Sequence, residues 1–486
     1  MRSPVAELGN SVRYLSTRDP GRPAATFSFE EVLLRGLAAD GGLYVPQRLP
    51  QPDLAALAGL PYPDLAARIL GLFVGDAFAG EALRELAAAA YRGFRHRAVA
   101  PLVQLDERLW LLELFHGPTL AFKDLALQVL GRLFDAVLAR RHEHVTIVGA
   151  TSGDTGSAAL AACAECAAAD IFILYPHGRI SEVQRRQMTT VEGAGAYAVA
   201  IEGTFDDCQD LVKALFADRA LTAELSLSAV NSINWARIAA QTVYYLAAGL
   251  ALGAPARRLS FAVPTGNFGN VYAAHVARAM GLPVARLVIA TNRNDVLARY
   301  FATGRMAIAA VEPSLSPSMD IQVASNFERL LFELKGGDGA ATAAAVAPLR
   351  RTGALPENEA EWREAQRLFS AYRVDDEGIV ESIARTYARS GIVIDPHSAV
   401  AVAAAETALR QRGAEDGGAT PMVALACAHP AKFPDAVERA TGIRPALPPA
   451  LGDLMERRER IVVLPNDLAQ VKSFIRARAR RTRTAA

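Results

Sequence analysis

The sequence predicts an α/β protein, in which parallel sheets are covered by helices. From about Arg108 onward, short apolar segments alternate with helical patterns, which is typical of parallel strands joined by helical crossovers. The predicted strands are 109–115, 145–148, 171–174, 197–201, 259–263, 284–290 and 422–426. With 486 residues, 51% of them hydrophobic and 21% charged, the chain can form two or three domains with large buried cores.

The N-terminal part is predicted to be mainly helical. Ser28 and Glu31 have the spacing of a capping box, and further helical patterns cover 64–73 and 81–92. We expect a helical region at 1–98, a larger α/β lobe at 99–124 and 232–486, and a smaller α/β lobe at 125–231. The alanine-rich segment 340–372 is predicted to be helical, with a break at 353–356.

Composition excludes several classes of protein. The 52 basic and 51 acidic residues leave a net charge of +1, whereas nucleic-acid and membrane-surface binders need a basic footprint. We expect neither partner. No apolar stretch is long enough to span a membrane, and Arg2, Glu7 and Asp19 interrupt any secretory signal.

The dispersed cysteines indicate a reducing, cytoplasmic location, and Cys163 and Cys166 are interpreted as buried helix residues rather than a redox or zinc pair. The basic run 476–483 is interpreted as a solvated helix end.

Lys123 is a candidate nucleophile. Only five of the 52 basic residues are lysines, so a lysine beside Ala121 and Phe122 requires a specific reason. It follows a predicted strand and opens a helix that runs to about Arg141. The positive end of the helix dipole and partial burial both disfavour its charged form. A neutral amine can form a Schiff base with a carbonyl group. An ordinary surface lysine is the alternative.

Two glycine-rich turns are candidate anion sites. The turn 264–270 joins a predicted strand to a helix at 271–280, and its backbone N–H groups suit a phosphate. It matches neither the P-loop nor the dinucleotide motif, and a plain turn is the alternative. The turn 148–157 could hold a carboxylate or a second phosphate. A nicotinamide site is disfavoured there, because Gly149 and Gly153 are too far apart and no acidic residue follows 171–174.

An amine that can form a Schiff base and two anion sites together suggest pyridoxal phosphate and an anionic amino-acid substrate. Five segments then resemble, in order, the threonine synthase family. They are the segment 27–46, His116-Gly-Pro-Thr-Leu-Ala-Phe-Lys-Asp124, Ser152-Gly-Asp-Thr-Gly156, Gly266-Asn-Phe-Gly-Asn270 and Ala428-His-Pro-Ala-Lys-Phe433. The resemblance extends from Tyr14 to about Ala440, which is nearly the whole chain.

This resemblance implies a fold-type-II pyridoxal-phosphate enzyme with two open α/β lobes and an added N-terminal helical region. Lys123 corresponds to the lysine that binds the cofactor. The residues that correspond to the cofactor-phosphate loop are Gly266, Asn267, Phe268, Gly269 and Asn270. Cys427 stands where the family usually has a threonine facing the pyridine nitrogen, and a thiol is a weaker hydrogen-bond partner. Ser152, Asp154 and Thr155 correspond to the substrate loop.

The implied reaction converts O-phospho-L-homoserine and water to L-threonine and phosphate, with Lys123 moving protons at Cα and Cβ. Asn234 and Arg237 are candidates for the substrate-phosphate site, although a structural ion pair is the alternative for Arg237. His116 and His429 flank the motifs and could simply fix loops. We expect a monomer or homodimer. Two other functions remain open: a related phospholyase acting on another phosphorylated amine, and a non-catalytic binding protein with this fold.

Overall fold

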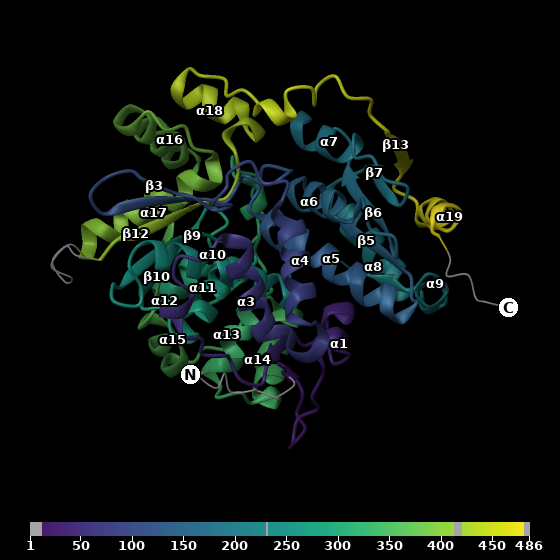
Figure 1. The fold of residues 1–486 in the computed structure, drawn as a ribbon, viewed down its shortest axis with the longest axis horizontal. Coiled ribbons are helices and arrows are strands. Elements are labelled where there is room, and N and C mark those ends of the chain that lie inside the picture. The colour runs from purple at the N-terminus through teal and green to yellow at the C-terminus, as the bar shows by residue number, and fades with distance from the viewer. Residues whose placement is uncertain (1–11, 230–231, 413–419, 481–486) are drawn as a thin grey trace, which may run out of the picture.

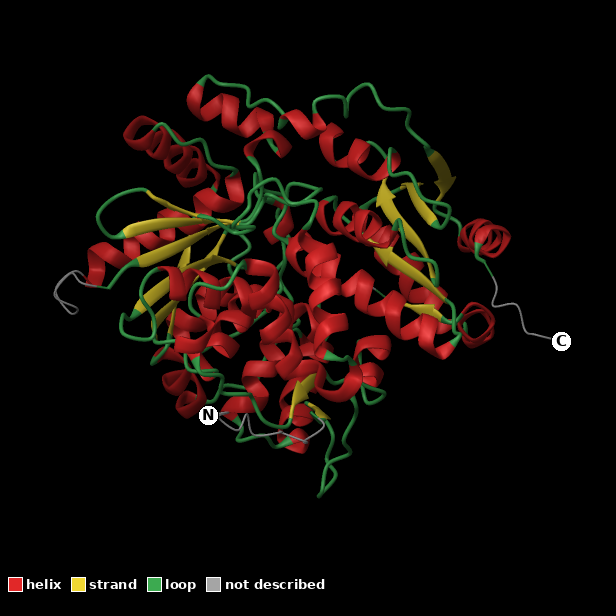
Figure 2. Ribbon diagram, viewed as in Figure 1, coloured by secondary structure: helices red, strands yellow, loops and turns green. Residues whose placement is uncertain are grey.

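The computed structural model describes residues 12–229, 232–412 and 420–480. The chain forms two α/β lobes with a mainly helical N-terminal region packed against them (Figure 1). The two lobe sheets lie on opposite sides of the view, and helices occupy the space between them (Figure 2). The fold class predicted from the alternation of strands and helices is confirmed.

The larger sheet has the order β11-β10-β9-β12-β4-β3, and only β3 is antiparallel to its neighbour. Its strands are β3 (Leu102–Gln104), β4 (Leu109–Glu113), β9 (Leu259–Pro264), β10 (Val284–Thr291), β11 (Phe369–Arg373) and β12 (Met422–Ala426). Apolar side chains on both faces of the sheet contact helices, so β9 and β12 are buried at every residue. This explains why these strands appear in the sequence as continuous apolar runs.

The smaller sheet has the order β13-β7-β6-β5-β8 and is parallel throughout. Its strands are β5 (Val145–Ala150), β6 (Ala169–Pro176), β7 (Ala196–Glu202), β8 (Leu227–Ser228) and β13 (Val462–Pro465). One face packs against α8, α9 and α19, and the other against α5 and α6. These helices are α5 (Lys123–Arg141), α6 (Asp154–Cys163), α8 (Phe205–Ala217), α9 (Arg219–Leu225) and α19 (Leu468–Arg478).

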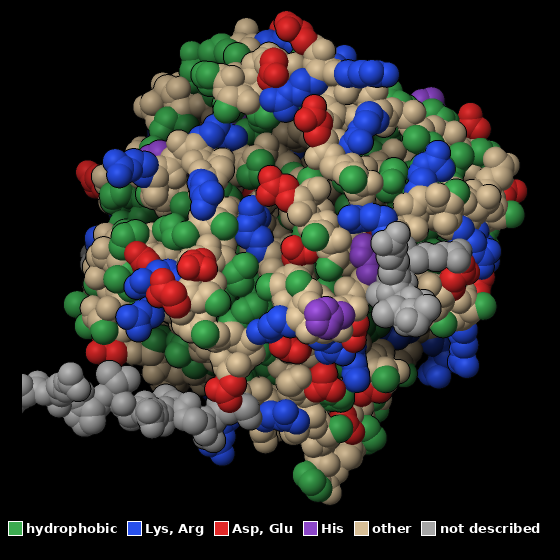
Figure 3. Space-filling model, turned by 45° about the vertical axis from the view of Figure 1, so that its right-hand side comes forward, with side chains coloured by type: hydrophobic (Ala, Val, Ile, Leu, Met, Phe, Trp, Pro, Cys, Tyr) green, Lys and Arg blue, Asp and Glu red, His purple; other side chains and the backbone are tan. Residues whose placement is uncertain are grey.

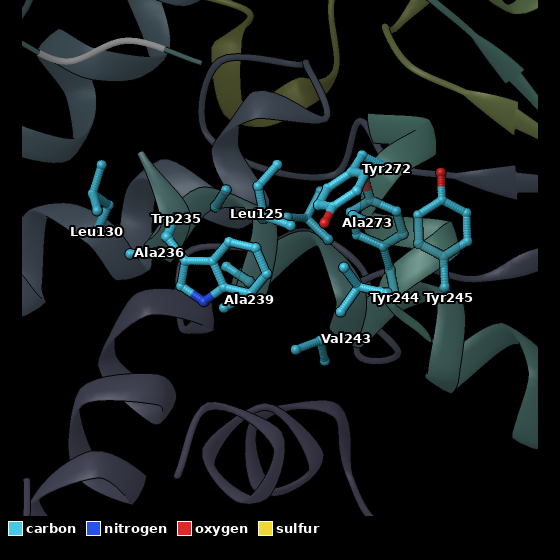
Figure 4. Packing of buried hydrophobic residues seen from close by; sticks show 14 of the residues in the cluster. Leu125, Leu130, Trp235, Ala236, Ala239, Val243, Tyr244, Tyr245, Tyr272 and Ala273 are labelled. Carbon is cyan, nitrogen blue, oxygen red and sulfur yellow. The ribbon is translucent and has the colours of Figure 1, made fainter. Parts of the chain in front are cut away.

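The N-terminal region packs on the long helix α10 (Trp235–Ala251). It contains a two-stranded antiparallel ribbon and four helices, namely β1 (Tyr14–Ser16), β2 (Tyr44–Pro46), α1 (Phe29–Arg35), α2 (Leu54–Leu57), α3 (Tyr62–Val74) and α4 (Gly80–Tyr91). The predicted capping box of Ser28 and Glu31 is confirmed at the start of α1. Trp235 meets the rings of Tyr14, Phe73 and Tyr272 edge-on, and Figure 4 shows it in the buried cluster with Leu125 and Ala239. This aromatic core therefore anchors the first turn of α10.

The remaining helices belong to the larger lobe or to the connections at its edge, except α7, which lies in the smaller lobe. They are α7 (Glu182–Thr189, in the smaller lobe), α11 (Gly269–Ala279), α12 (Val296–Thr303), α13 (Phe327–Leu334), α14 (Gly339–Thr352), α15 (Glu359–Gln366), α16 (Asp376–Ser390), α17 (Pro396–Arg412) and α18 (Pro434–Thr441). The helical prediction for 340–372 holds for α14 and α15 but is wrong at its end. There, β11 pairs with β10 and buries Phe369, because pairing at the sheet edge overrides the local helical preference.

The expected range 232–486 for the larger lobe is too long. β13 pairs with β7 of the smaller sheet, and Phe474 of α19 packs edge-on against Phe172 and Tyr197. The C-terminal segment therefore crosses back to the smaller lobe (Figure 1). Its short strand, Val462–Pro465, carries no sequence signal strong enough to predict this return.

Charged side chains of both signs are mixed on the face that Figure 3 shows, with no broad area of one sign. This agrees with the balanced composition. Within the described ranges, no helix has the length and apolar character needed to cross a membrane.

Part of the basic C-terminal run is held by a buried carboxylate rather than solvated. Asp170 is fully buried and accepts hydrogen bonds from Arg480 Nε at 2.6 Å and His144 Nε2 at 3.0 Å. Burial alone would raise the pKa of Asp170, but the hydrogen bonds from His144 and Arg480 hold it below its ordinary value. The part of the tail beyond residue 480 lies outside the described residues.

We expect Arg480→Ala to lower the free energy of unfolding by about 1–2 kcal/mol at neutral pH, because Asp170 loses a charged hydrogen-bond donor. Since the pKa of Asp170 is lowered in the folded state, this stabilisation is present above its unfolded pKa. It is lost as pH falls through the lower folded pKa. Urea unfolding of both proteins from pH 7 downward measures the difference.

The matched control is Arg476→Ala, which removes an ion pair to Glu224 from an exposed position of α19. We expect it to cost no more than about 0.5 kcal/mol. Equal losses for the two variants, or a loss for Arg480→Ala that does not shrink on acidification, would contradict the role given to Asp170.

Candidate active site

The predicted site residues gather where parallel strands of both sheets end. Lys123 follows β4, the turn 264–269 follows β9, Cys427 follows β12, and Ser152 follows β5. Ligands of α/β proteins bind at the carboxyl ends of such strands. The two sheets thus bring together motifs that are more than 300 residues apart in the chain.

Lys123 is the first residue of α5 and is only 8% exposed. Its Nζ atom lies 3.4 Å from Asp154 Oδ2 and 3.3 Å from Ser318 Oγ. Burial lowers the pKa of Lys123, and Lys432 and Arg237 lower it further, whereas Asp154 opposes this change. The net result is a lowered pKa, so the predicted destabilisation of the charged amine is confirmed.

A tight loop places Lys123. Asp124 is fully buried and accepts hydrogen bonds from the backbone N–H of Thr119 at 2.8 Å and from its hydroxyl at 2.6 Å. A Cβ on Gly117 would lie 2.4 Å from Asp124 Cβ, so only glycine fits there. Leu120 has a φ of +63°, a strained conformation for a leucine, and its carbonyl accepts from His429 N at 3.0 Å. The loop is therefore held rigidly from both sides.

Asp154 lies at the start of α6, but its carboxylate is used by protein groups rather than open to a substrate. It accepts from Lys432 at 2.8 Å, Gln184 at 2.9 Å and Ser318 at 3.0 Å, in addition to Lys123. Its two loop neighbours differ. Ser152 and Thr155 are half-buried, and their hydroxyl groups have no hydrogen-bond partner among the described residues. Of the three side chains of this loop that were predicted to bind substrate, Ser152 and Thr155 therefore remain available as donors, among the residues that the structure describes.

The turn after β9 presents free backbone donors. In the described part of the chain, the N–H groups of Gly266, Asn267, Phe268 and Gly269 donate to no other group. Phe268 has a φ of +63°, which curls the backbone at the start of α11. A Cβ on Gly266 would lie 2.9 Å from Ile321 Cδ1 and 3.2 Å from Ser318 O, so glycine allows this loop to approach the segment 318–321 closely. This arrangement suits a phosphate group.

Asn270 connects this turn to Cys427. Its Oδ1 atom accepts from the hydroxyl groups of Tyr244 at 2.5 Å and Tyr245 at 2.7 Å, so its Nδ2 atom points to Cys427 Sγ, 3.9 Å away. Burial raises the pKa of the Cys427 thiol well above its ordinary value, which keeps the thiol neutral. Cys427 is thus an uncharged group at the end of β12.

Arg237 is a buried cation that has no anionic partner among the described residues. It is 2% exposed, its Nε and Nη1 atoms have no hydrogen-bond partner, and none of the described residues forms an ion pair with it. Burial lowers its pKa to about 10. Buried charges are normally paired, so a guanidinium without a partner among the described residues is an exception. The alternative of a structural ion pair finds no partner in the part of the chain described.

Asn234, in contrast, is not available to a substrate. Its Oδ1 atom caps α10 by accepting from Ala236 N at 3.0 Å, and its Nδ2 atom donates to Leu33 O at 2.8 Å. The expectation that Asn234 binds substrate is therefore corrected: both polar atoms are used to join α10 to α1. Asn231 lies outside the described residues.

The two histidines that flank the motifs fix loops. His116 Nε2 lies 2.8 Å from Glu113 Oε2, and His429 Nδ1 accepts from Ala431 N at 3.2 Å. Burial, with nearby Arg95 and His116, lowers the pKa of His429 to about 4, so it is neutral at physiological pH.

Cys163 ends α6 and Cys166 lies just beyond it, so the prediction of two helix cysteines is correct only for Cys163. No group of three or more possible metal ligands occurs within the described ranges.

Three important residues were missed in the sequence: Lys432, Ser318 and Gln184, which all bind Asp154. Lys432 could have been found, because it is one of only five lysines and lies in an apolar segment between Pro430 and Phe433. Ser318 lies in a short 3-10 helix, Pro317–Met319, and carries no sequence signal.

Three family models match the chain. The model for the threonine synthase N terminus matches residues 13–91, that for pyridoxal-phosphate dependent enzymes matches residues 94–347, and that for the threonine synthase C-terminal part matches residues 398–475. The site agrees with the second model, because a buried amine with a lowered pKa and a turn with free backbone donors suit an aldehyde that carries a phosphate. The chain is therefore a pyridoxal-phosphate-dependent enzyme of fold type II.

A threonine synthase from Pseudomonas aeruginosa is 53% identical over 468 residues, covering 96% of this chain and 98% of that protein. The crystal structure of a threonine synthase with bound pyridoxal phosphate from Brucella melitensis has a TM-score of 0.93 and 48% identity, covering 97% of this chain and 100% of the other. The yeast threonine synthase structure has a TM-score of 0.91 and 39% identity, covering 96% and 99%. This chain belongs to the threonine synthase family, as the ordered motifs predicted.

Proposed function

We propose that the enzyme converts O-phospho-L-homoserine and water to L-threonine and phosphate. The observation that carries this proposal is a buried amine, Lys123, whose pKa is lowered by its burial and further by Lys432 and Arg237, together with the fact that the Arg237 guanidinium has no anion partner among the described residues. A substrate with a phosphate group and an amino-acid end matches this pair and the free donors near it. Membership of the threonine synthase family supports the same substrate.

The cofactor would be held at three places. Lys123 would bind its aldehyde carbon, the N–H groups of 266–269 would bind its phosphate, and Cys427 would face its ring nitrogen as a neutral partner. Asn270 would act through Cys427 rather than on the cofactor phosphate, because its amide is bonded to tyrosines. When bound, pyridoxal phosphate supplies an electron sink that makes the substrate Cα acidic.

The other steps fall to side chains of the chain. Ser152 and Thr155 would orient the substrate carboxylate through their free hydroxyl groups. Arg237 would bind the substrate phosphate with two N–H groups and stabilise it as it leaves from Cγ. Lys123 would move the protons from Cα and Cβ before the phosphate leaves, and water would add at Cβ afterwards. Asp154 would remain the counter-ion of the site.

Turnover of O-phospho-L-homoserine, with phosphate and threonine measured together, tests this function. We expect equal amounts of the two products. Phosphate without threonine would replace the proposal with a phospholyase that acts on a related phosphorylated amine. A colourless protein with no turnover would identify a non-catalytic relative. Further proposals are a cytoplasmic location, with which the four free cysteines agree, and a monomeric or homodimeric state.

A further inference from the structure

Lys432 is a fully buried lysine with no role in the reaction described above. It lies in a short 3-10 helix, Pro430–Lys432, between β12 and α18, and its side chain is 0% exposed. Its Nζ atom lies 2.8 Å from Asp154 Oδ1 and 2.8 Å from Thr119 O. A buried ammonium is costly unless it is paired, and here the carboxylate of Asp154 pairs with it.

One carboxylate is shared by two amines at unequal distances. Asp154 is 2.8 Å from Lys432 but 3.4 Å from Lys123. Although burial alone would raise the pKa of Asp154, Lys432 and then Lys123 hold it well below its ordinary value. The negative charge is therefore neutralised mainly by Lys432. When Lys123 is protonated, it adds a second positive charge beside the Asp154–Lys432 ion pair. A third positive charge, on Arg237, is close by.

We propose that Lys432 is a positioning residue that occupies Asp154 as its counter-ion and so leaves the amine of Lys123 able to give up its proton. Without Lys432, Asp154 and Lys123 would form a simple buried ion pair. Such a pair would hold the amine as an ammonium, which cannot attack a carbonyl. The inference rests on the proposed role of Lys123 as the lysine that binds the cofactor.

The charged and titratable groups that face Lys123 or its partner Asp154 come from several elements of the fold. They are Asp154 on α6, Lys432 after β12, Arg237 on α10, Cys427 after β12, and, next to Asp154, His397 on α17. Among the residues that the structure describes, Asp154 is the only acid in direct contact with the amine. His397 is tied elsewhere, because its Nδ1 atom pairs with Asp395 at 2.7 Å and its Nε2 atom accepts from Ser318 N at 3.2 Å.

The test is the pKa of Lys123 in three variants. Lys432→Met keeps the apolar stem but removes a positive charge, so we expect the pKa of Lys123 to rise by about one or more, as charges within 4–6 Å do. Asp154→Asn removes the anion, so the pKa should fall. In the double variant both charges are gone, and the pKa should return to the wild-type value or slightly below it.

The readout is acetylation of Lys123 by trace acetic anhydride at graded pH, followed by mass spectrometry of its peptide. This measurement uses the full-length chain freed of cofactor, so it gives the pKa of the Lys123 amine whether or not the enzyme makes threonine. The visible absorbance of the cofactor-loaded protein, titrated with pH, provides a second measurement with the same expected order. The matched control is Lys335→Met, which breaks a 2.7 Å ion pair to Glu361 away from the site and should leave both titrations unchanged.

A fall or no change of the Lys123 pKa in Lys432→Met would overturn the proposal. If that variant does not fold, the double variant decides, because it contains no unpaired charge at either position. A double variant whose Lys123 pKa lies well above the wild-type value, or as low as that of Asp154→Asn, would also overturn it. A loss of turnover with unchanged titrations would indicate a merely structural lysine and count against the proposal.

Discussion

Replacing Lys123 with alanine should lower turnover of O-phospho-L-homoserine by at least about 10³-fold, because one amine serves both to bind the cofactor and to move protons. The fold should survive this change. Asp154 keeps Lys432 as its partner at 2.8 Å, so no buried carboxylate is left unpaired. The loss of activity can therefore be assigned to chemistry rather than to unfolding.

The measurement is steady-state release of phosphate and threonine, together with borohydride reduction of the wild-type protein and peptide mapping. The label should lie on Lys123. Lys213→Ala is the matched control, because Lys213 is exposed and pairs with Asp210 on its own helix. Turnover within tenfold of wild type in Lys123→Ala, or a label on another lysine, would contradict the assignment of the site.

Replacing Arg237 with methionine should have opposite effects on activity and stability. We expect kcat/KM for the phosphorylated substrate to fall by about 100-fold, since a desolvated contact of a guanidinium with phosphate is lost. The ligand-free protein should become more stable by about 1–3 kcal/mol, because methionine removes a buried charge that has no hydrogen-bond partner. A residue kept for folding would not give this combination.

Arg329→Met is the matched control. Arg329 is also fully buried and its pKa is also lowered to about 10 by burial, but its guanidinium donates to Tyr44 O at 3.0 Å and Ile233 O at 2.6 Å. Its loss should destabilise the protein by about 3 kcal/mol, because these carbonyl groups lose their donor. Urea unfolding of both variants, with and without inorganic phosphate, makes the comparison.

Phosphate should stabilise the wild type more than Arg237→Met, as a ligand that binds only the folded state does. If Arg237→Met loses as much stability as Arg329→Met, the guanidinium has a structural role and the proposed phosphate site is wrong. The contrast between the two arginines uses the same side chain, the same burial and the same pKa direction. Only the presence of partners differs.

Local patterns were sufficient for the features whose cause is local. The capping box at Ser28, the strand at Met422–Ala426 and the start of the helix at Lys123 all depend on residues adjacent in sequence. The buried amine was also predictable, because an arginine-rich chain placed a lysine in an apolar segment at a helix start. Strands buried on both faces must be apolar throughout, so most of the two sheets could be predicted.

Predictions were wrong where a residue is controlled by a distant one. Phe369–Arg373 forms a strand because it pairs with the edge of β10. In the same way, β13 joins the smaller sheet because it pairs with the edge of β7. Asn234 caps a helix and binds Leu33 O, a contact across 201 residues. No spacing in the sequence reports such pairings.

The amino-acid sequence by itself determined the fold class, the family and the residues that present an amine and backbone donors, because each depends on side-chain type and short spacing. Only the tertiary structure decided how charge is shared among those residues. Asp154 meets Lys432 across 278 positions of the chain, and Arg237 meets no anion at all among the described residues. Whether a buried charge is neutralised depends on distances of about 3 Å between remote segments, and only packing sets those distances.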